Sequence, residues 1–575
     1  MLLYFAAMSL PVPATIAEQS SYRATSRHAD VQAFIHALAA RAPQLIVDTM
    51  GKSGLGQEIP VLRLGSAAAT PEAAQAAARA NGRPTVLVLA NIHAGEVEGK
   101  ESVLALAREI ALGPLAHLAE QTTLLLVPDY NPDGNDRIDV TNRALDLAAF
   151  EGQIGPEGGV GTRNTAQGYN LNRDYVKLAA IESRHLARLY GTWRPHLTID
   201  CHTTNGSLHG YHLTYDTAHL LPSSPRAPIL YVRDTLLPAV SRQLAANTGF
   251  RTFFYGNFRH QEDPTQGWET YPGLPRFGSH YRGLTGRMDI LLEAYSYLSF
   301  RERCAVMQAT LTAILAYVAE HGAEMVEIVH AAEMETVARG RNPDAQDFLG
   351  VSYAQLRRTR RDSTTVTIDD TGSLPVELSY PIYPLGEPVE ILSWDLESLR
   401  THAVPGKTLT TYRAPHYARF VPSKVVSRPY GYLLPASCER IAEHLLRHNL
   451  AVHMVEAPAT VEVEVEAFVV DAIGRTSSRD IAADAPPETL FFGHRELERY
   501  PVRPGDFLVL MAQPFGCLAT YLLEPESDDG LVEWGFFPEV TAGSVYPVRR
   551  ILQATAIAAR PWTAAPGKME GAAER

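Results

Sequence analysis

The sequence lacks the features that mark several common classes of protein. Four cysteines occur in 575 residues, at Cys201, Cys304, Cys438 and Cys517, and no two of them form a C-x-x-C pair. Cysteine-based zinc knuckles need such pairs, and disulfide frameworks are typical of much smaller secreted chains. We therefore expect these cysteines to be small buried hydrophobic residues.

Positive charge is also scarce. The chain has 51 Lys and Arg against 64 Asp and Glu, which gives a formal net charge of -13. Nucleic acids and anionic membranes are negatively charged and would repel such a chain. Beyond the first residues, no uninterrupted apolar run reaches the ~18 residues that a membrane-spanning helix needs. The sequence thus predicts neither a nucleic-acid partner nor a membrane span.

Two catalytic motifs are missing as well. The G-K-S at Gly51–Ser53 is not a phosphate-binding loop, because the glycine required five residues earlier is replaced by Ile46. No G-x-S-x-G occurs, which excludes the nucleophile elbow of many serine hydrolases. Cys201 beside His202 is no nucleophile–base pair, because neighbours on a strand point to opposite faces.

The first 17 residues are apolar and end in A-x-x-A, as a secretory leader does. However, no Lys or Arg precedes Arg23, and Pro11 and Pro13 interrupt the apolar run. We interpret residues 1–17 as a candidate signal peptide. This favours a periplasmic or secreted location over a cytoplasmic one.

Residues 20–335 alternate short apolar runs with helical patterns. The runs predict strands at 58–65, 85–90, 196–204 and 288–297, and the longer periodic segments predict helices at 31–43, 99–112, 182–195 and 301–322. This order indicates an α/β fold with a mixed central sheet flanked by helices. The alanine-rich segment 66–84 has no clear apolar stripe, so we predict a long loop there.

A second domain is expected at residues 340–560. Period-two alternation, as in V-E-V-E-V-E-A-F at 461–468, and frequent Pro and Gly predict a β-rich accessory domain of antiparallel strands. One helix is predicted within it at 438–449. Residues 561–575 are expected to form a flexible tail.

Polar residues that suit a metal follow three of the predicted strands. His93 and Glu96 come after the strand at 85–90, His202 ends the strand at 196–204, and Glu293 lies on the strand at 288–297. The carboxyl ends of strands are where α/β sheets bind ligands. A catalytic zinc takes three nitrogen or oxygen ligands and one open position, which His93, Glu96 and His202 can supply. Taken singly, Glu96 could instead stabilise a helix start, and each histidine could be structural.

Arginine and asparagine are concentrated in Asn131–Arg137 and Gly161–Tyr175. The planar guanidinium matches a carboxylate, so Arg173 together with the Asn172 amide suits a substrate carboxylate. A solvated surface position is the alternative for each arginine, and for Arg137 above all.

In chain order, H-x-x-E, N-P-D-G, N-L-N-R, D-C-H-T and L-L-E-A-Y resemble the motifs of the carboxypeptidase A-like family of zinc metallocarboxypeptidases. The resemblance covers about residues 25–325. It implies that His93, Glu96 and His202 bind one Zn²⁺ per chain and that Glu293 is the general base. It further implies that Asn172 and Arg173 hold the terminal carboxylate of a peptide.

The same resemblance implies three further features. An upstream arginine would polarise the scissile carbonyl; Arg163 fits best and Arg137 is the runner-up. A mobile tyrosine would precede the catalytic glutamate, and Tyr271 and Tyr281 are both candidates. Where the family commonly has an aspartate bonded to the first zinc histidine, this chain has Asn170, whose amide would raise the basicity of that histidine less.

The sequence therefore predicts a zinc metallocarboxypeptidase whose partner is a peptide substrate. Two alternatives stay open. The aspartoacylase-like N-acyl amino acid deacylases resemble this family and share the H-x-x-E, the later histidine, N-R and the glutamate. The second alternative is a binding module with a relict metal site. Glu293 argues against it, because binding alone does not require a base. No pattern specifies an oligomeric state.

Overall fold

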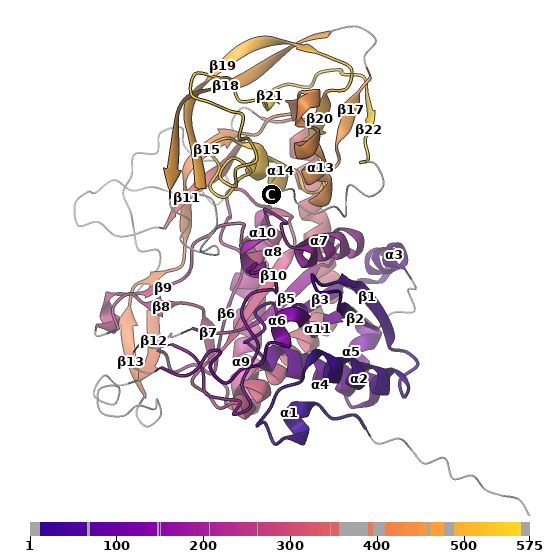
Figure 1. The fold of residues 1–575 in the computed structure, drawn as a ribbon, viewed down its shortest axis with the longest axis vertical. Coiled ribbons are helices and arrows are strands. Elements are labelled where there is room, and N and C mark those ends of the chain that lie inside the picture. Colours follow the sequence, from indigo (N-terminus) through magenta and orange to yellow (C-terminus); the bar gives the residue numbers. More distant parts are fainter. Residues whose placement is uncertain are drawn as a thin grey trace, which may run out of the picture.

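A computed structural model of the chain shows an α/β region joined to a β-rich region (Figure 1). It describes residues 12–65, 70–146, 149, 151–205, 208–261, 263–344, 347–355, 389–394, 409–456, 461–476 and 488–564. Most of the candidate leader at 1–17 and most of the tail at 561–575 lie outside these residues. Within the described part of the chain, every helix is too short or too polar to span a bilayer.

The central sheet of the α/β region has eight strands. In spatial order they are β1 (Ile46–Lys52), β2 (Glu58–Leu64), β4 (Thr123–Val127), β3 (Thr85–Ala90), β5 (Leu197–Thr203), β10 (Met288–Ala294), β6 (Leu213–Asp216) and β7 (Thr252–Phe254). Strands β4, β3, β5 and β10 run parallel to one another. β2 is antiparallel to both β1 and β4, β6 is antiparallel to β10, and β7 is parallel to β6. The predicted mixed sheet is confirmed.

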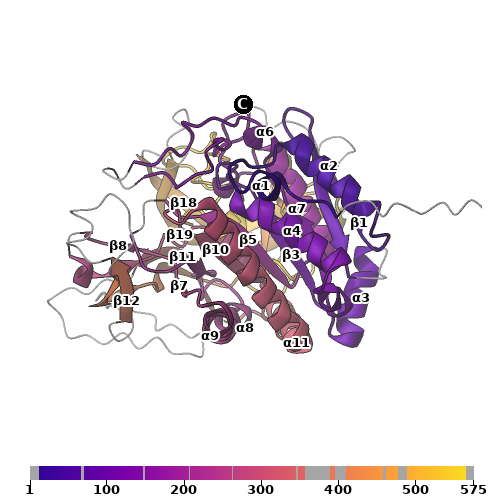
Figure 2. The ribbon, with the colours of Figure 1, turned by 90° about the horizontal axis from the view of Figure 1, so that it is seen from below.

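The two faces of this sheet are covered by different parts of the chain. Val86 and Val88 of β3 pack in a core with helices α2 (His28–Ala39), α4 (Glu98–Leu112), α9 (Leu237–Thr248) and α11 (Phe300–Arg341). Figure 2 shows α4 and α11 lying side by side on this face. Leu87 and Leu89 point to the opposite face, towards α7 (Ile181–Trp193), because side chains alternate along a strand.

The alanine-rich segment is a helix in part, and the predicted loop is wrong there. Helix α3 spans Pro71–Asn81; the Thr70 side chain caps it by accepting from the Ala73 amide, and Pro71 occupies its first turn. Gly82, with a φ of 64°, ends it in the left-handed region. Alanine has the highest helix propensity, so good caps suffice where only a narrow apolar stripe is present.

Helix α11 is longer than predicted. It starts at the Ser299 cap and continues nearly 20 residues past the predicted end at 322, for 42 residues in all. Its later turns bury Met325, Val329 and Ala332, so the apolar stripe does not stop at 322. A side chain at Gly340 would lie 2.2 Å from the Met511 carbonyl oxygen, so the end of α11 packs directly on the β-rich region.

The β-rich region contains a seven-stranded antiparallel sheet, as the sequence predicted. Its order is β19 (Glu488–Val502), β18 (Val461–Thr476), β21 (Arg549–Ile551), β16 (Gly431–Leu434), β20 (Phe507–Leu510), β17 (His453–Val455) and β22 (Ala559–Pro561). The predicted helix is α13 (Glu439–Arg447), and α14 (Gly516–Leu523) is buried beneath the sheet. Smaller pairs join β11 (Phe348–Gln355) to β15 (Phe420–Ser427) and β12 (Val389–Trp394) to β13 (Leu409–Ala414).

One hydrophobic core crosses from the α/β region into the β-rich region. Leu186 and Tyr190 of α7 belong to the same cluster as Ile441 and Leu445 of α13. Each fully buried side chain of this kind contributes about 1.5–3 kcal/mol of burial free energy. The two regions therefore share a core, although the sequence suggested two separate domains.

A fragment of residues 20–335 is expected to be insoluble or to unfold far below the temperature of the full chain. It would expose the α7 side of the core to water and lose the end of α11. Differential scanning fluorimetry and sedimentation would measure this, with a chain ending at residue 564 as the control. A soluble 20–335 fragment with the full chain's melting temperature would show that the shared core is not required.

Candidate active site

The turn after β3 holds the first two predicted metal ligands. β3 ends at Ala90, and the amide of Glu96 donates to the His93 carbonyl at 2.9 Å, which closes the turn before α4. Both side chains are buried. A side chain at Gly95 would lie 2.8 Å from Cδ of Arg143, so glycine leaves the room that this arginine needs.

Strand register brings the remaining predicted groups to the same edge of the sheet. Ala90 of β3 lies beside Cys201 of β5, and His202 of β5 lies beside Glu293 of β10. All three strands are parallel, so their carboxyl ends meet at one edge. Residues from three distant parts of the sequence therefore converge there.

His93, Glu96 and His202 have the geometry of a metal site. One ligand atom from each lies within 4.8 Å of the other two. Nδ1 of His93 is 3.0 Å from Oε1 of Glu96, and Nδ1 of His202 is 3.0 Å from Oε2. Two imidazole nitrogens and a carboxylate oxygen are the donor set of a catalytic zinc, so these residues fit the ion.

The outward nitrogens of both histidines face oxygen atoms. Nε2 of His93 lies 3.0 Å from Oδ1 of Asn170, and Nε2 of His202 lies 3.1 Å from Oδ1 of Asp200. An oxygen there favours the proton on Nε2, which leaves the Nδ1 lone pair for a metal. Asn170 thus bonds to the first histidine and can orient its ring, as we expected from its place in the N-L-N-R motif.

The charges of the site are strongly coupled. Burial, helped by the positive charge of Arg163, lowers the pKa of His93 to about 3, so this ring is neutral at pH 7. Burial would raise the pKa of Glu96, yet His93, His202 and Arg143 hold it well below its usual range. Burial would lower the pKa of His202, but Asp200 and Glu96 raise it well above its usual value. Metal binding would therefore replace a proton on His202.

Glu293 reaches the same site from β10. Burial together with the nearby Glu96 charge raises the pKa of Glu293 to about 8, while His202 and Arg163 act in the opposite direction. A divalent cation nearby would favour the ionised form by Coulomb attraction. A carboxylate whose pKa lies near neutrality is suited to accept a proton and pass it on.

A cavity of about 200 Å³ opens in front of these residues. His93, Glu96 and Glu293 line one part of it, and Asn172 and Arg173 line another. Nη1 of Arg163 donates to Oε1 of Glu96 at 3.1 Å, so Arg163 lies next to the metal ligands. The guanidinium of Arg173 lies 4.2 Å from the centre of the Phe277 ring. The cavity therefore has an acid–base group, a candidate metal site and two cationic side chains.

Comparison with known proteins agrees with this chemistry. Residues 31–194 match the family model described as zinc carboxypeptidase. Over these residues the chain is similar to the zinc carboxypeptidase family. Carboxypeptidase 2 of Trichophyton rubrum is 22% identical over 542 residues, which cover 92% of this chain and 86% of that protein.

Two other similar proteins match a smaller part of this chain. Carboxypeptidase D of Mus musculus is 33% identical over 151 residues, which cover 24% of this chain and 10% of that protein. A metallo-carboxypeptidase from Burkholderia cenocepacia superposes with a TM-score of 0.36 at 19% identity, covering 50% of this chain and 68% of that chain.

Three residues of the candidate site were missed by sequence reasoning. Arg143, with a φ of 51°, donates to Oε1 of Glu96 at 3.1 Å and to the Thr204 carbonyl at 2.9 Å. Asp200 and Tyr255 line the cavity. Asp200 had a usable signal, because period-two alternation puts it on the face of His202. Arg143 and Tyr255 lie in irregular segments without a motif.

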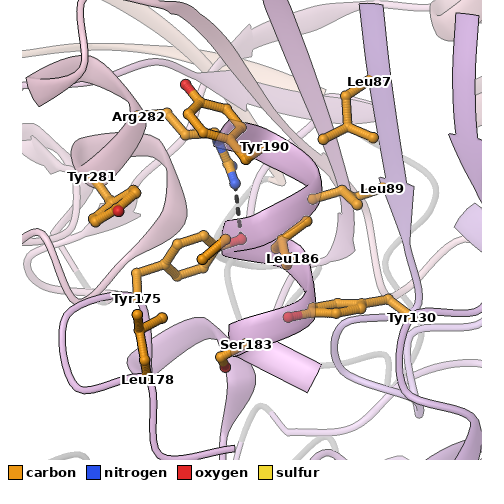
Figure 3. Close-up of a pocket in the computed structure, with 11 residues that line it drawn as sticks. Leu87, Leu89, Tyr130, Tyr175, Leu178, Ser183, Leu186, Tyr190, Tyr281 and Arg282 are labelled. Atoms are coloured by element: carbon orange, nitrogen blue, oxygen red, sulfur yellow. Dashed lines mark hydrogen bonds between the residues drawn. The ribbon is translucent and has the colours of Figure 1, made fainter. Parts of the chain in front are cut away.

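Of the other residues that the sequence suggested for the site, one lines this cavity and two lie elsewhere. Tyr271 lines the cavity. Arg137 is exposed and donates to the Ala166 carbonyl at 3.3 Å, so it lies outside the lining. Tyr281 faces a separate, mainly apolar space of about 20 Å³ between β3, α7 and α10 (Gly278–Leu284), beside Tyr175 and Arg282 (Figure 3). Its hydroxyl is 2.9 Å from Nδ1 of His448.

Proposed function

We propose that this protein is a zinc carboxypeptidase that removes the C-terminal residue of a peptide, with one zinc ion held by His93, Glu96 and His202 and with Glu293 as the general base. One observation carries the proposal. Glu293 and His202 are neighbours in strand register, and Arg173 lines the same cavity as both Glu96 and Glu293. A proton acceptor, a metal site and a carboxylate-binding cation thus share one space.

Zinc, when bound, acts as a Lewis acid that acidifies water and polarises a carbonyl. The other steps fall to residues of the chain. Glu293 accepts the proton of the attacking water and delivers it to the leaving amine. Arg163, whose Nη1 already lies 3.1 Å from Glu96, faces the negative charge that develops on the carbonyl oxygen.

Substrate orientation depends on the opposite wall of the cavity. The guanidinium of Arg173 stacks on Phe277, which restricts its motion, and Oδ1 of Asn172 accepts from the Gly278 amide at 3.1 Å. A guanidinium fixed in this way is prepared to hold a carboxylate through two parallel hydrogen bonds. This favours substrates with a free C-terminus over internal sites.

The two alternatives from the sequence are less well supported. The two relatives reported above are named carboxypeptidases, which does not favour an N-acyl amino acid deacylase. A binding module would have no use for a base at Glu293 beside a complete ligand set.

Peptides with a free C-terminus are expected to be cleaved, whereas their C-terminal amides are expected to be poor substrates. Arg173→Ala should raise KM for the free peptides about ten- to a hundredfold, because a charged hydrogen bond contributes about 1.5–3 kcal/mol. Release of free amino acids from matched peptide pairs measures both effects.

Arg79→Ala is the control, because Arg79 is exposed on α3, away from the cavity. The same assay with N-acyl amino acids tests the deacylase alternative. Equal cleavage of free and amidated peptides would contradict the proposal and indicate an endopeptidase. Preferential hydrolysis of N-acyl amino acids would indicate the deacylase.

A further inference from the structure

The cavity wall opposite the metal ligands is formed by residues 271–279. Tyr271, Pro272, Phe277, Gly278 and Ser279 all line the cavity. This stretch is mostly irregular, with Phe277 preceding the short helix α10. An irregular wall has few hydrogen bonds of its own, so its position must depend on what packs behind it.

Residues of the β-rich region hold this wall from behind at Arg276. Nε of Arg276 donates to Oδ1 of Asp529 at 2.7 Å, its backbone amide donates to the other oxygen of Asp529, and Nη2 lies 3.0 Å from Oε1 of Glu533. The Trp534 ring lies against the guanidinium, 5.0 Å from its carbon. Arg276 and Asp529 are buried, so water screens this pair little.

The β-rich region also bonds to the residues that flank the wall on both sides. The amides of Trp268 and Thr270 donate to the carbonyls of Pro415 and Tyr417 at 2.8 and 3.1 Å. At the other end, the Tyr281 hydroxyl bonds to His448. Residues 268–281 are thus attached at three points to the β-rich region, whose described residues do not line the cavity.

The wall in turn fixes the carboxylate-binding residues. Phe277, next to Arg276, stacks on the guanidinium of Arg173, and the Gly278 amide bonds to Asn172. A displacement of Arg276 would therefore move Phe277 and with it the guanidinium that is to meet the substrate. Small displacements of a binding group weaken substrate orientation strongly.

We propose that Asp529 and Glu533 are positioning residues, through which the β-rich region sets the place of Arg173 and so the affinity for the peptide C-terminus. The inference rests on the proposed function for its kinetic part. It gives the β-rich region a role in substrate binding without direct contact to the substrate.

Asp529→Asn is the first test. Asn keeps the volume of Asp and tolerates the φ of 65° that Asp529 adopts, while Glu533 remains to neutralise Arg276. KM for an N-acetylated tripeptide with a free carboxylate should rise at least about fivefold, with kcat within about twofold and zinc content unchanged. Hydrogen exchange over residues 271–279 should become faster. Glu533→Gln, nearer the surface, is the milder second variant.

Asn449→Gly is the matched control. It removes another contact between the regions, in which the side-chain amide of Asn449 donates to the Ala187 carbonyl at 2.9 Å. Glycine accepts the φ of 60° at this position. This contact is on α7, which does not line the cavity. The control should change neither KM nor exchange over 271–279, even if it lowers the melting temperature.

Two results would overturn the inference: unchanged KM and exchange in folded Asp529→Asn and Glu533→Gln proteins, or the same rise in KM in Asn449→Gly. If the unsubstituted chain cleaves no peptide, the proposed function fails, and hydrogen exchange alone decides. Faster exchange in Asp529→Asn than in Asn449→Gly would then still support positioning, and equal exchange would overturn it.

Discussion

Glu293→Gln is expected to lower kcat about 10²–10⁴-fold with little change in KM, because the amide keeps the size of the side chain but cannot accept a proton at neutral pH. The three metal ligands are untouched, so zinc should remain at about one ion per chain. Steady-state kinetics on a peptide with a free C-terminus, with metal analysis of the same sample, measures both quantities.

Glu157→Gln is the control for the chemical change itself. Glu157 is exposed and pairs with exposed Arg23, and surface pairs contribute little to stability. This variant should keep full turnover. Near-normal turnover in Glu293→Gln would instead mean that another group accepts the proton, and that the L-L-E-A-Y motif had been misread.

Loss of a metal ligand is expected to remove zinc and activity together. His202→Ala removes a ring that is buried between Glu96 and Asp200 and leaves two of the three ligands, which hold zinc poorly. Zinc content after dialysis should fall from about one ion to nearly none, and peptide hydrolysis should fall below detection. Chelator treatment of the unchanged chain should have the same effect, reversed by added zinc.

His36→Ala is the control, because His36 is exposed on α2. It should keep both zinc and activity. The assignment of the ligands would be wrong if the His202→Ala protein held a full zinc ion. Full activity in metal-free protein would refute zinc catalysis altogether.

The sheet and its active edge were predictable because they depend on local patterns. Buried parallel strands such as β3 are continuous apolar runs, and their ends are marked by the polar residues that follow. Three such ends predicted that His93, His202 and Glu293 would meet, and strand register brings them together. The roles of these residues in catalysis stay predictions.

What the sequence could not supply depends on contacts between distant segments. Arg143 reaches Glu96 from an irregular loop in a left-handed conformation, and no spacing rule points to it. Tyr281 has the right residue type and a plausible position, but its hydroxyl is bound to His448, far along the chain. The core shared by α7 and α13 is equally invisible, because each helix alone is an ordinary amphipathic segment.

That shared core bears on how the chain leaves the ribosome. Leu186 and Tyr190 are synthesised about 250 residues before their partners Ile441 and Leu445. At about 5–20 residues per second, roughly 12–50 s pass before the partners have been made. During this interval the side of α7 that later packs against α13 has no partner and stays exposed to water. Nascent chains in this state are natural clients for a chaperone that shields apolar surface until translation is complete.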